Sequence, residues 1–270
     1  MLSIIITHHK TPILLKLCLK SIKENVGDIE YEIIVVDSEG IHESQEEIRE
    51  WFDQLTIKNF PEIRFISFRG NAGYAKIVNE GITRSRGEYV LILNADIIIL
   101  NGSIDKLIKF IQEHPKVGIV GPRLLTFSGA IQNSCFHFPT IGAIIARRTF
   151  LGKLNWGRNK IEQFLIFSGN NNHSYPVDWL QGSAMLVRKA AIEKVGLLDE
   201  SFFMYLEDAD WCRRFWQNGF EVVYLSTAQM AHYYYRTSQK WGGLLDLFLN
   251  KYARMHLMSA FKYFWKWRKA

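Results

Sequence analysis

Hydrophobic residues in the first half of the chain form short runs that alternate with stretches of helical spacing. Four runs have the length and the flanking turn residues that are typical of strands buried on both faces: Leu2–Thr7, Tyr31–Asp37, Ile63–Phe68 and Tyr89–Leu93. Between the first two, apolar residues at positions 14, 15, 18, 19 and 22 recur at helical spacing. This order predicts an α/β fold with a Rossmann-like, mostly parallel sheet flanked by helices.

The second half of the chain has a less regular pattern. Further strands and helices are expected at Val117–Val120, Ala184–Val187, Lys189–Val195, Asp208–Gln217 and Glu221–Tyr224. Residues 134–176 show little periodicity between these elements. From Trp241 onward the chain has no proline and many aromatic and basic residues, which predicts a C-terminal helical extension.

Net charge is concentrated at the C-terminus. The chain carries 33 Lys and Arg against 27 Asp and Glu, a formal charge of +6, and residues 251–270 hold six of the cations and no acid. The rest of the chain is therefore balanced, since 33 − 6 = 27 cations face 27 acids. A neutral body argues against general binding of nucleic acid, which needs a basic surface.

The cysteines and the N-terminal sequence indicate the cellular compartment in which the protein works. The three cysteines are odd in number and widely spaced, which argues against a disulfide framework or structural zinc and favours reducing conditions. The chain begins without the basic segment of a signal peptide, and its most apolar stretch, residues 89–100, is interrupted by Asn94 and Asp96. We therefore expect a cytoplasmic protein without a membrane-spanning helix.

Polar residues follow two of the predicted strands at their carboxyl ends, where parallel sheets bind ligands. Asp37 ends the second run, and its carboxylate suits a ribose or a uracil-type base edge as well as it suits helix capping. Asn94 and Asp96 follow the fourth run, and on an extended chain both face one divalent cation or diphosphate. A turn is the alternative, but it leaves Asp96 beside the apolar residues 97–100 without a partner.

A glycine-containing segment, Gly70–Ala75, lies between a predicted strand and a helical pattern. Glycine lets the backbone approach a ligand, and a helix N-terminus favours phosphate. The spacing is not GxGxxG, and glycine turns are common. Trp179, further along the chain, suits stacking on a sugar ring about as well as it suits a core.

Three acids in four residues, Glu207, Asp208 and Asp210, open a predicted helix. The helix dipole stabilises negative charge there, and capping accounts for one or two of the acids. Arg214, one turn beyond Asp210, suggests a carboxylate held in place beside a cleft. His232 follows a predicted strand and suits a metal ion, although a lone histidine is more often structural.

Eight short motifs stand in a characteristic order along the chain: Ser3–Thr7, Glu32–Ser38, Asn71–Ile82, Leu93–Asp96, Gly182–Arg188, Gly196–Phe203, Glu207–Asp210 and His232. This order resembles the family 2 glycosyltransferases, especially bacterial rhamnosyltransferase-like members. The resemblance implies a GT-A fold over residues 1–238, with a nucleotide-sugar-binding half at 1–120 and an acceptor-binding, catalytic half at 121–238. Residues 239–270 form the basic, aromatic helical extension.

The resemblance also implies roles for individual residues. Asp208 is the expected general base, and Asp96 with His232 is the expected ligand set for Mg²⁺ or Mn²⁺. The remaining donor-binding residues are expected to be Thr7, Asp37, Asn71, Gly73, Asn79 and Asn94. Residues expected to contact the acceptor or to support the site are Trp179, Gly182, Glu207, Asp210 and Arg214.

Two stretches depart from the family pattern near the nucleotide pocket. The first strand ends in Thr7-His8-His9 where Tyr-Asn is more usual, and Asp37-Ser38-Glu39-Gly40 replaces the more usual Asp-Asn-x-Ser. Asn94 stands at the first position of the family's DxD motif.

The expected function is that of a metal-dependent, inverting glycosyltransferase. Its donor is expected to be a UDP- or dTDP-linked sugar, and its acceptor a cell-surface glycan or the lipid-linked precursor of one. A nucleotidylyltransferase is one alternative, but residues 7–12 lack the glycine-rich loop expected after its first strand. A non-catalytic carbohydrate-binding protein is another, and it would not require Asp96, Asp208 and His232 together.

The tail at 251–270 adds an expectation about location. Its six cations and its aromatic residues suit the headgroup region of an anionic membrane at the inner face of the cell. A packing helix whose lysines extend to solvent is the alternative.

Overall fold

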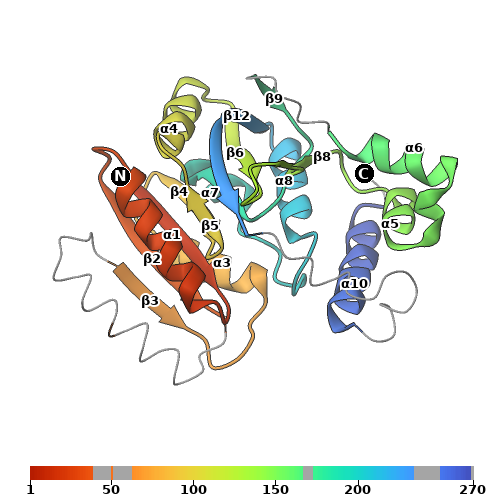
Figure 1. Ribbon diagram of the computed structural model, residues 1–270, viewed down its shortest axis with the longest axis horizontal. Coiled ribbons are helices and arrows are strands. Elements are labelled where there is room, and N and C mark those ends of the chain that lie inside the picture. The colour runs from red at the N-terminus through yellow and green to blue at the C-terminus, as the bar shows by residue number, and fades with distance from the viewer. Residues whose placement is uncertain (39–49, 51–62, 167–172, 234–249, 269–270) are drawn as a thin grey trace.

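The computed structural model describes residues 1–38, 50, 63–166, 173–233 and 250–268 (Figure 1). Its centre is a ten-stranded sheet with the main strand order β3-β2-β1-β4-β11-β6-β12-β5, while β7 pairs with β6 and β9 with β12. The strands of this sheet are β1 (Leu2–His8), β2 (Tyr31–Asp37), β3 (Ile63–Ser67), β4 (Tyr89–Asn94), β5 (Ile97–Ile99), β6 (Val117–Leu125), β7 (Ile131–Gln132), β9 (Ser174–Pro176), β11 (Ala184–Arg188) and β12 (Glu221–His232). A separate antiparallel pair joins β8 (Cys135–Phe136) to β10 (Trp179–Leu180).

The sheet confirms the predicted α/β class but is mixed in direction. Strands β1 to β4 are parallel, as expected, and the helices α1 and α3 lie in the connections from β1 to β2 and from β3 to β4. Strand β11 runs antiparallel to both of its neighbours, β4 and β6, and β5 runs antiparallel to β12. Among the described strands of this half, the β6–β12 pair is parallel.

Helices cover both faces of the sheet, which explains the continuous apolar runs. Their bounds are α1 (Pro12–Asn25), α3 (Tyr74–Arg84), α4 (Ser103–Glu113), α5 (Ile141–Arg148), α6 (Asn155–Phe164), α7 (Lys189–Val195), α8 (Glu207–Gln217) and α10 (Lys251–Lys266), with a 3₁₀ turn η1 at Phe150–Lys153. Ile4 and Ile6 of β1 point into a core with α1 and α4. Ile5 points into the opposite core, which α3, α7, α8 and α10 complete.

The weakly periodic region contains the short helices α5 and α6. On α5 the small residues Ala143 and Ala146 are buried, whereas Ile141 and Ile145 are exposed. Apolar side chains therefore occupy both the buried and the exposed face, and this arrangement obscures the helical pattern. Figure 1 places α5, α6 and α10 together at one end of the molecule, beyond the edge of the sheet.

The predicted C-terminal helix is present as α10. Tyr263 and the following Trp267 are buried against the body, while Phe261 and Trp265 are exposed. One face of α10 therefore packs against the body, as the alternative of a packing helix expects. The predicted domain boundary at 238/239 lies outside the described residues. None of the described helices is long and apolar enough to span a bilayer.

Candidate active site

Strand register brings the predicted donor residues to one edge of the sheet. Thr7 of β1 pairs with Asn94 of β4, and His8 of β1 pairs with Asp37 of β2. The Thr7 hydroxyl donates to the Asn94 side-chain oxygen at 3.0 Å, which fixes the orientation of that amide. Because parallel strands end together, the carboxyl ends of β1, β2 and β4 form one continuous rim.

Asp37 is held by a histidine that our sequence analysis assigned no role. The backbone N–H of Thr11 donates to Nε2 of His8, so the proton of this neutral ring lies on Nδ1. Nδ1 donates in turn to Oδ1 of Asp37 at 3.0 Å. Both side chains are almost fully buried. This chain of bonds fixes the carboxylate at the end of β2.

Asp96 and His232 lie together, as the metal-site prediction requires. Oδ1 of Asp96 is 3.4 Å from Nε2 of His232. The other ring nitrogen of His232 bonds to the amide oxygen of Gln132 at 2.9 Å, and the amide nitrogen of Gln132 donates to Gln181. Since an amide oxygen only accepts, Nδ1 carries a proton, and Nε2 is the ring nitrogen that faces Asp96.

Asp208 opens α8 and faces the backbone of the Gly182 turn. Its Oδ2 accepts the Gly182 N–H at 2.8 Å, and its Oδ1 accepts the N–H of Ala209. Burial raises the pKa of Asp208 to about 6, and these backbone donors limit the rise. The buried indole N–H of Trp179 also lowers this pKa, although it forms no full hydrogen bond within the described chain.

Glu207 is a second buried acid beside Asp208. Burial and the neighbouring Asp208 carboxylate raise the pKa of Glu207 well above its usual range. Burial, with the charges of Glu207, Asp208 and Asp96, likewise raises the pKa of Tyr74. The Tyr74 hydroxyl donates to the carbonyl of Gly182. Burial therefore raises the pKa of all three neighbouring groups, Glu207, Asp208 and Tyr74.

The loop before α8 has an unusual backbone. Tyr205 and Leu206 both have positive φ angles, 74° and 66°, which cost non-glycine residues about 1–2 kcal/mol each. The loop is tied to α3, because the Tyr74 N–H donates to the Phe203 carbonyl at 2.8 Å. A side chain at Gly73 would collide with that carbonyl. Gly73 thus allows a close contact that holds the backbone leading to Asp208.

Two other predicted site residues bind distant parts of the chain. Asp210 is fully buried and accepts from Arg214 and Lys266 and from the Trp267 indole, which joins α8 to the end of α10. The amide of Asn79 donates to the Leu198 carbonyl and accepts the Leu198 N–H, both at 2.9 Å. These bonds occupy the polar atoms of both residues in structural contacts. Asn71, in turn, accepts the Gly73 N–H in a local turn.

Sequence reasoning assigned no role to His8, Tyr74 or Gln132. His8 appeared only as a departure from the family pattern, although two consecutive histidines at a strand end are a usable signal. Gln132 belongs to a two-residue strand that is too short to produce a detectable pattern. Tyr74 was part of the glycine-containing segment, but only the folded chain places it against Gly182.

The chain belongs to glycosyl transferase family 2, because the model of that family matches residues 3–196. Over 193 residues it is 31% identical to the N-acetylglucosaminyl-diphospho-decaprenol L-rhamnosyltransferase of Mycobacterium tuberculosis, a match that covers 67% of this chain and 62% of that protein. It is also 27% identical to the rhamnosyltransferase WbbL of Escherichia coli K12, over 97% of this chain and 92% of that one. The chain thus spans less than two thirds of the mycobacterial relative.

Solved structures confirm the GT-A glycosyltransferase fold. The crystal structure of GalNAc-T7 with UDP, GalNAc and Mn²⁺ matches 87% of this chain and 43% of that one, with a TM-score of 0.67 and 13% identity. The rhamnosyltransferase-like resemblance and the predicted fold are therefore both confirmed.

Proposed function

We propose that this protein is a metal-dependent, inverting glycosyltransferase that moves a sugar from a nucleotide-sugar donor to a hydroxyl of a glycan or lipid-linked glycan precursor. The observation that carries the proposal is Asp208, a buried carboxylate with a pKa of about 6, fixed by Gly182 beside Trp179. A general base works best when its pKa lies near the working pH. Family membership and the names of the rhamnosyltransferase relatives support the same activity.

The nucleotide is assigned to the rim formed by β1, β2 and β4. Asp37, fixed by His8, offers an acceptor to the N–H of a uracil or thymine ring, which favours a UDP- or dTDP-linked donor. Thr7 and Asn94 lie on the same rim between the base and the phosphates. Asn71, Gly73, Asn79, Asp210 and Arg214 receive supporting roles, because their described bonds shape the backbone around the site.

Asp96 and His232 would hold the Mg²⁺ or Mn²⁺ ion. Oδ1 of Asp96 is buried without a hydrogen bond within the described residues and lies 3.4 Å from Nε2 of His232, so the pair fits a metal ion. When bound, such an ion stabilises negative charge on the departing nucleoside diphosphate.

The transfer is a single displacement. The acceptor oxygen bonds to the anomeric carbon on the face opposite the departing diphosphate, and Asp208 accepts the hydroxyl proton. Attack from the opposite face inverts the anomeric configuration.

The proposal is tested by the stereochemistry of the product. Sugar nucleotides are first screened by release of the nucleoside diphosphate, and the anomeric configuration of the product is then determined by NMR. We expect the configuration opposite to that of the donor. Retention would contradict a single displacement with Asp208 as the base.

We also propose that α10 attaches the protein to the inner face of an anionic membrane. Phe261 and Trp265 are 70% and 60% exposed on this helix, and residues 250–268 hold five cations and no acid. Aromatic and basic side chains on one exposed surface suit the headgroup region.

Vesicle binding tests this attachment. Deletion of α10 would also remove buried core residues such as Tyr263, so a point variant is preferable. In co-sedimentation with phosphatidylglycerol vesicles, Phe261→Ser should weaken binding about tenfold, because one buried aromatic side chain is lost from the lipid. Phe127→Ser, which changes an exposed phenylalanine on the β6–β7 turn, is the matched control. Equal binding by the wild type and both variants would refute the attachment.

A further inference from the structure

An apolar groove of about 420 Å³ separates α5 from α10, on the end of the molecule away from the sheet edge formed by β3 (Figure 1). Its lining residues are Ile141, Ile144, Ile145, Leu257, Ala260, Phe261, Phe264, Trp265 and Arg268. The volume lies within the range of small-molecule pockets, about 300–1,000 Å³. Exposed apolar surface of this kind marks a place where another molecule binds.

Positive charge lies beside this groove. Arg147 and Arg148 end α5, directly after the lining residues Ile144 and Ile145. Burial, with the positive charges of Arg148 and Arg147, lowers the pKa of His256 on α10 to about 3. His256 is therefore neutral, its Nδ1 forms no hydrogen bond within the described residues, and the charge at this end of the groove belongs to the arginines.

The surrounding elements are basic as a whole. Residues 141–166 hold five cations against one acid, and residues 250–268 hold five cations and no acid. Because the net charge of the whole chain is only +6, the groove lies in its most basic region. A ligand that combines a hydrocarbon chain with an anionic group matches both features.

A continuous series of contacts leads from these arginines to Asp208. The Arg147 guanidinium lies 4.9 Å from the Phe164 ring centre, and the Phe164 ring is 5.9 Å from that of Trp179. Trp179 in turn adjoins Asp208.

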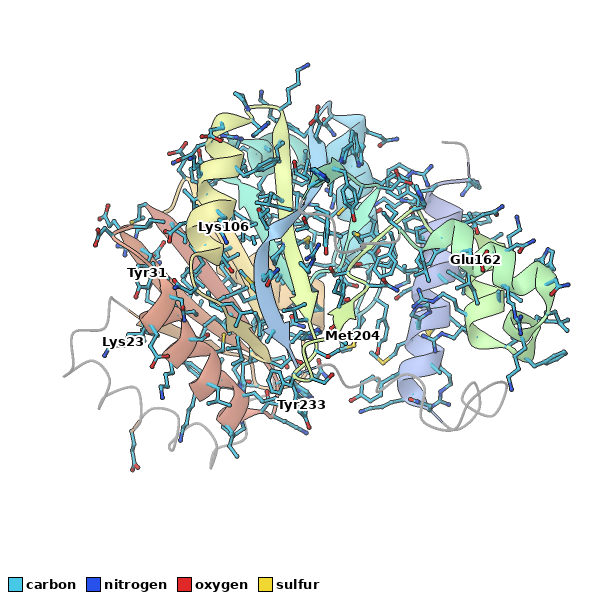
Figure 2. All side chains as sticks on the ribbon, turned by 45° about the horizontal axis from the view of Figure 1, so that its top comes forward. Lys23, Tyr31, Lys106, Glu162, Met204 and Tyr233 are labelled. Carbon is cyan, nitrogen blue, oxygen red and sulfur yellow. The ribbon has the colours of Figure 1, made fainter. Side chains whose placement is uncertain are left out.

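A second connection runs through the loop before α8. The His256 ring lies 5.2 Å from that of Tyr205, and Ser259 of α10 donates to the carbonyl of Met204, which lies beside this helix (Figure 2). The groove, the arginines and the catalytic base therefore follow one another in space. This order matches a ligand with a hydrocarbon chain, an anionic linker and a reacting sugar.

We infer that the groove binds the hydrocarbon chain of a lipid-diphosphate acceptor, with its diphosphate at Arg147 and Arg148 and its sugar directed toward Trp179 and Asp208. This inference rests on the proposed glycosyltransferase function and specifies the acceptor class and its binding site. A single lipid molecule bound in the groove would be additional to the bilayer contact proposed for α10, because the groove lies between two helices and has its cations next to one stretch of its lining.

Geranylgeranyl diphosphate, which carries no sugar, is the probe for this site. Its binding to the full chain is followed by isothermal titration calorimetry. We expect the probe to bind at least about tenfold more tightly than inorganic diphosphate or geranylgeraniol, because each comparison ligand lacks one half of the interaction. If geranylgeraniol bound as tightly as the probe, the assignment of the diphosphate to the arginines would be wrong. If inorganic diphosphate bound as tightly as the probe, the assignment of the hydrocarbon chain to the groove would be wrong.

Neighbouring residues on α10 provide matched variants. Leu257→Glu places a carboxylate in the groove and should weaken probe binding at least about tenfold, whereas Met258→Glu, on a residue outside the lining, should leave it within about twofold. Arg148→Gln should weaken the probe but not geranylgeraniol, with Arg158→Gln as its control. Equal loss in Leu257→Glu and Met258→Glu would indicate a general bilayer contact, and a dimer broken by Leu257→Glu would indicate a second copy of the chain; either result overturns the inference.

These binding measurements use no donor and no turnover. A protein that binds the probe as expected but transfers no sugar would contradict the proposed function alone. A protein that transfers sugar but does not distinguish the probe from geranylgeraniol would contradict this inference alone.

Discussion

Replacement of Asp208 by asparagine should reduce sugar transfer by about 10²–10⁴-fold and leave donor affinity within about twofold. Asparagine keeps the shape of the side chain and can accept one of the two backbone N–H groups of Gly182 and Ala209, but its amide cannot accept the proton of the acceptor hydroxyl. The measurement pairs turnover with direct titration of the donor. Asp178→Asn, which changes a partly exposed acid bonded to Phe138, is the control and should be near wild type.

The pH dependence of kcat/KM distinguishes a general-base role of Asp208 from a purely structural role. The folded-state pKa of Asp208 is raised to about 6, so kcat/KM should fall as the pH drops through 6 and level off above it. The residual activity of Asp208→Asn should lack this dependence. Unchanged turnover in Asp208→Asn, or the same pH profile in both proteins, would remove Asp208 from the base role.

Replacement of Asp96 by alanine should abolish the metal dependence of donor binding. Asp96 and His232 are the pair that would hold the ion, and removal of the carboxylate leaves one protein ligand. We expect donor affinity in the presence of Mn²⁺ to fall by about 10–100-fold, to the value measured with EDTA. Asp105→Ala, in the first turn of α4, removes an exposed acid as the control. If Asp96→Ala retained the wild-type response to metal, the ligand assignment would be wrong.

Much of the candidate site could be predicted from strand ends. Asp37, Asn94 and Asp96 each follow an apolar run, and the parallel register of β1, β2 and β4 brings those ends to one rim. Asp96 and His232 also lie close together, since β5, just after Asp96, pairs with the end of β12. The local sequence pattern was sufficient to predict that these residues lie near one another, because neighbouring parallel strands of a sheet end side by side.

The acids of α8 could not be distinguished from sequence alone. Asp208 and Asp210 are two residues apart, so they point about 200° apart around the helix axis. Asp208 faces Gly182, 26 residues before it, whereas Asp210 faces Lys266 and Trp267, 56 and 57 residues after it. The sequence predicts three acids at a helix start, and only long-range packing decides which of them face the site.

The arrangement of the C-terminal half could not be predicted, because it depends on long-range contacts that leave no local pattern in the sequence. Strand β11 lies between β4 and β6 and runs antiparallel to both, an arrangement that strand-helix alternation does not predict. The helix α10 was predicted as a membrane or packing helix, but its bonds to the 199–204 loop were not. Ser259, Lys262 and Lys266 bind that loop, so the C-terminal helix supports the backbone that leads to Asp208.

Metal-dependent release of nucleoside diphosphate is the measurement that tests the central claim most directly. A panel of UDP- and dTDP-linked sugars is incubated with the wild-type protein, with Mn²⁺ or Mg²⁺ and then with EDTA, in the presence and absence of a lipid-diphosphate-linked sugar. We expect at least one donor to release its nucleotide, faster with the acceptor, and we expect EDTA to stop the release. No release from any donor with metal and acceptor present, or release at an equal rate in EDTA, would contradict the account.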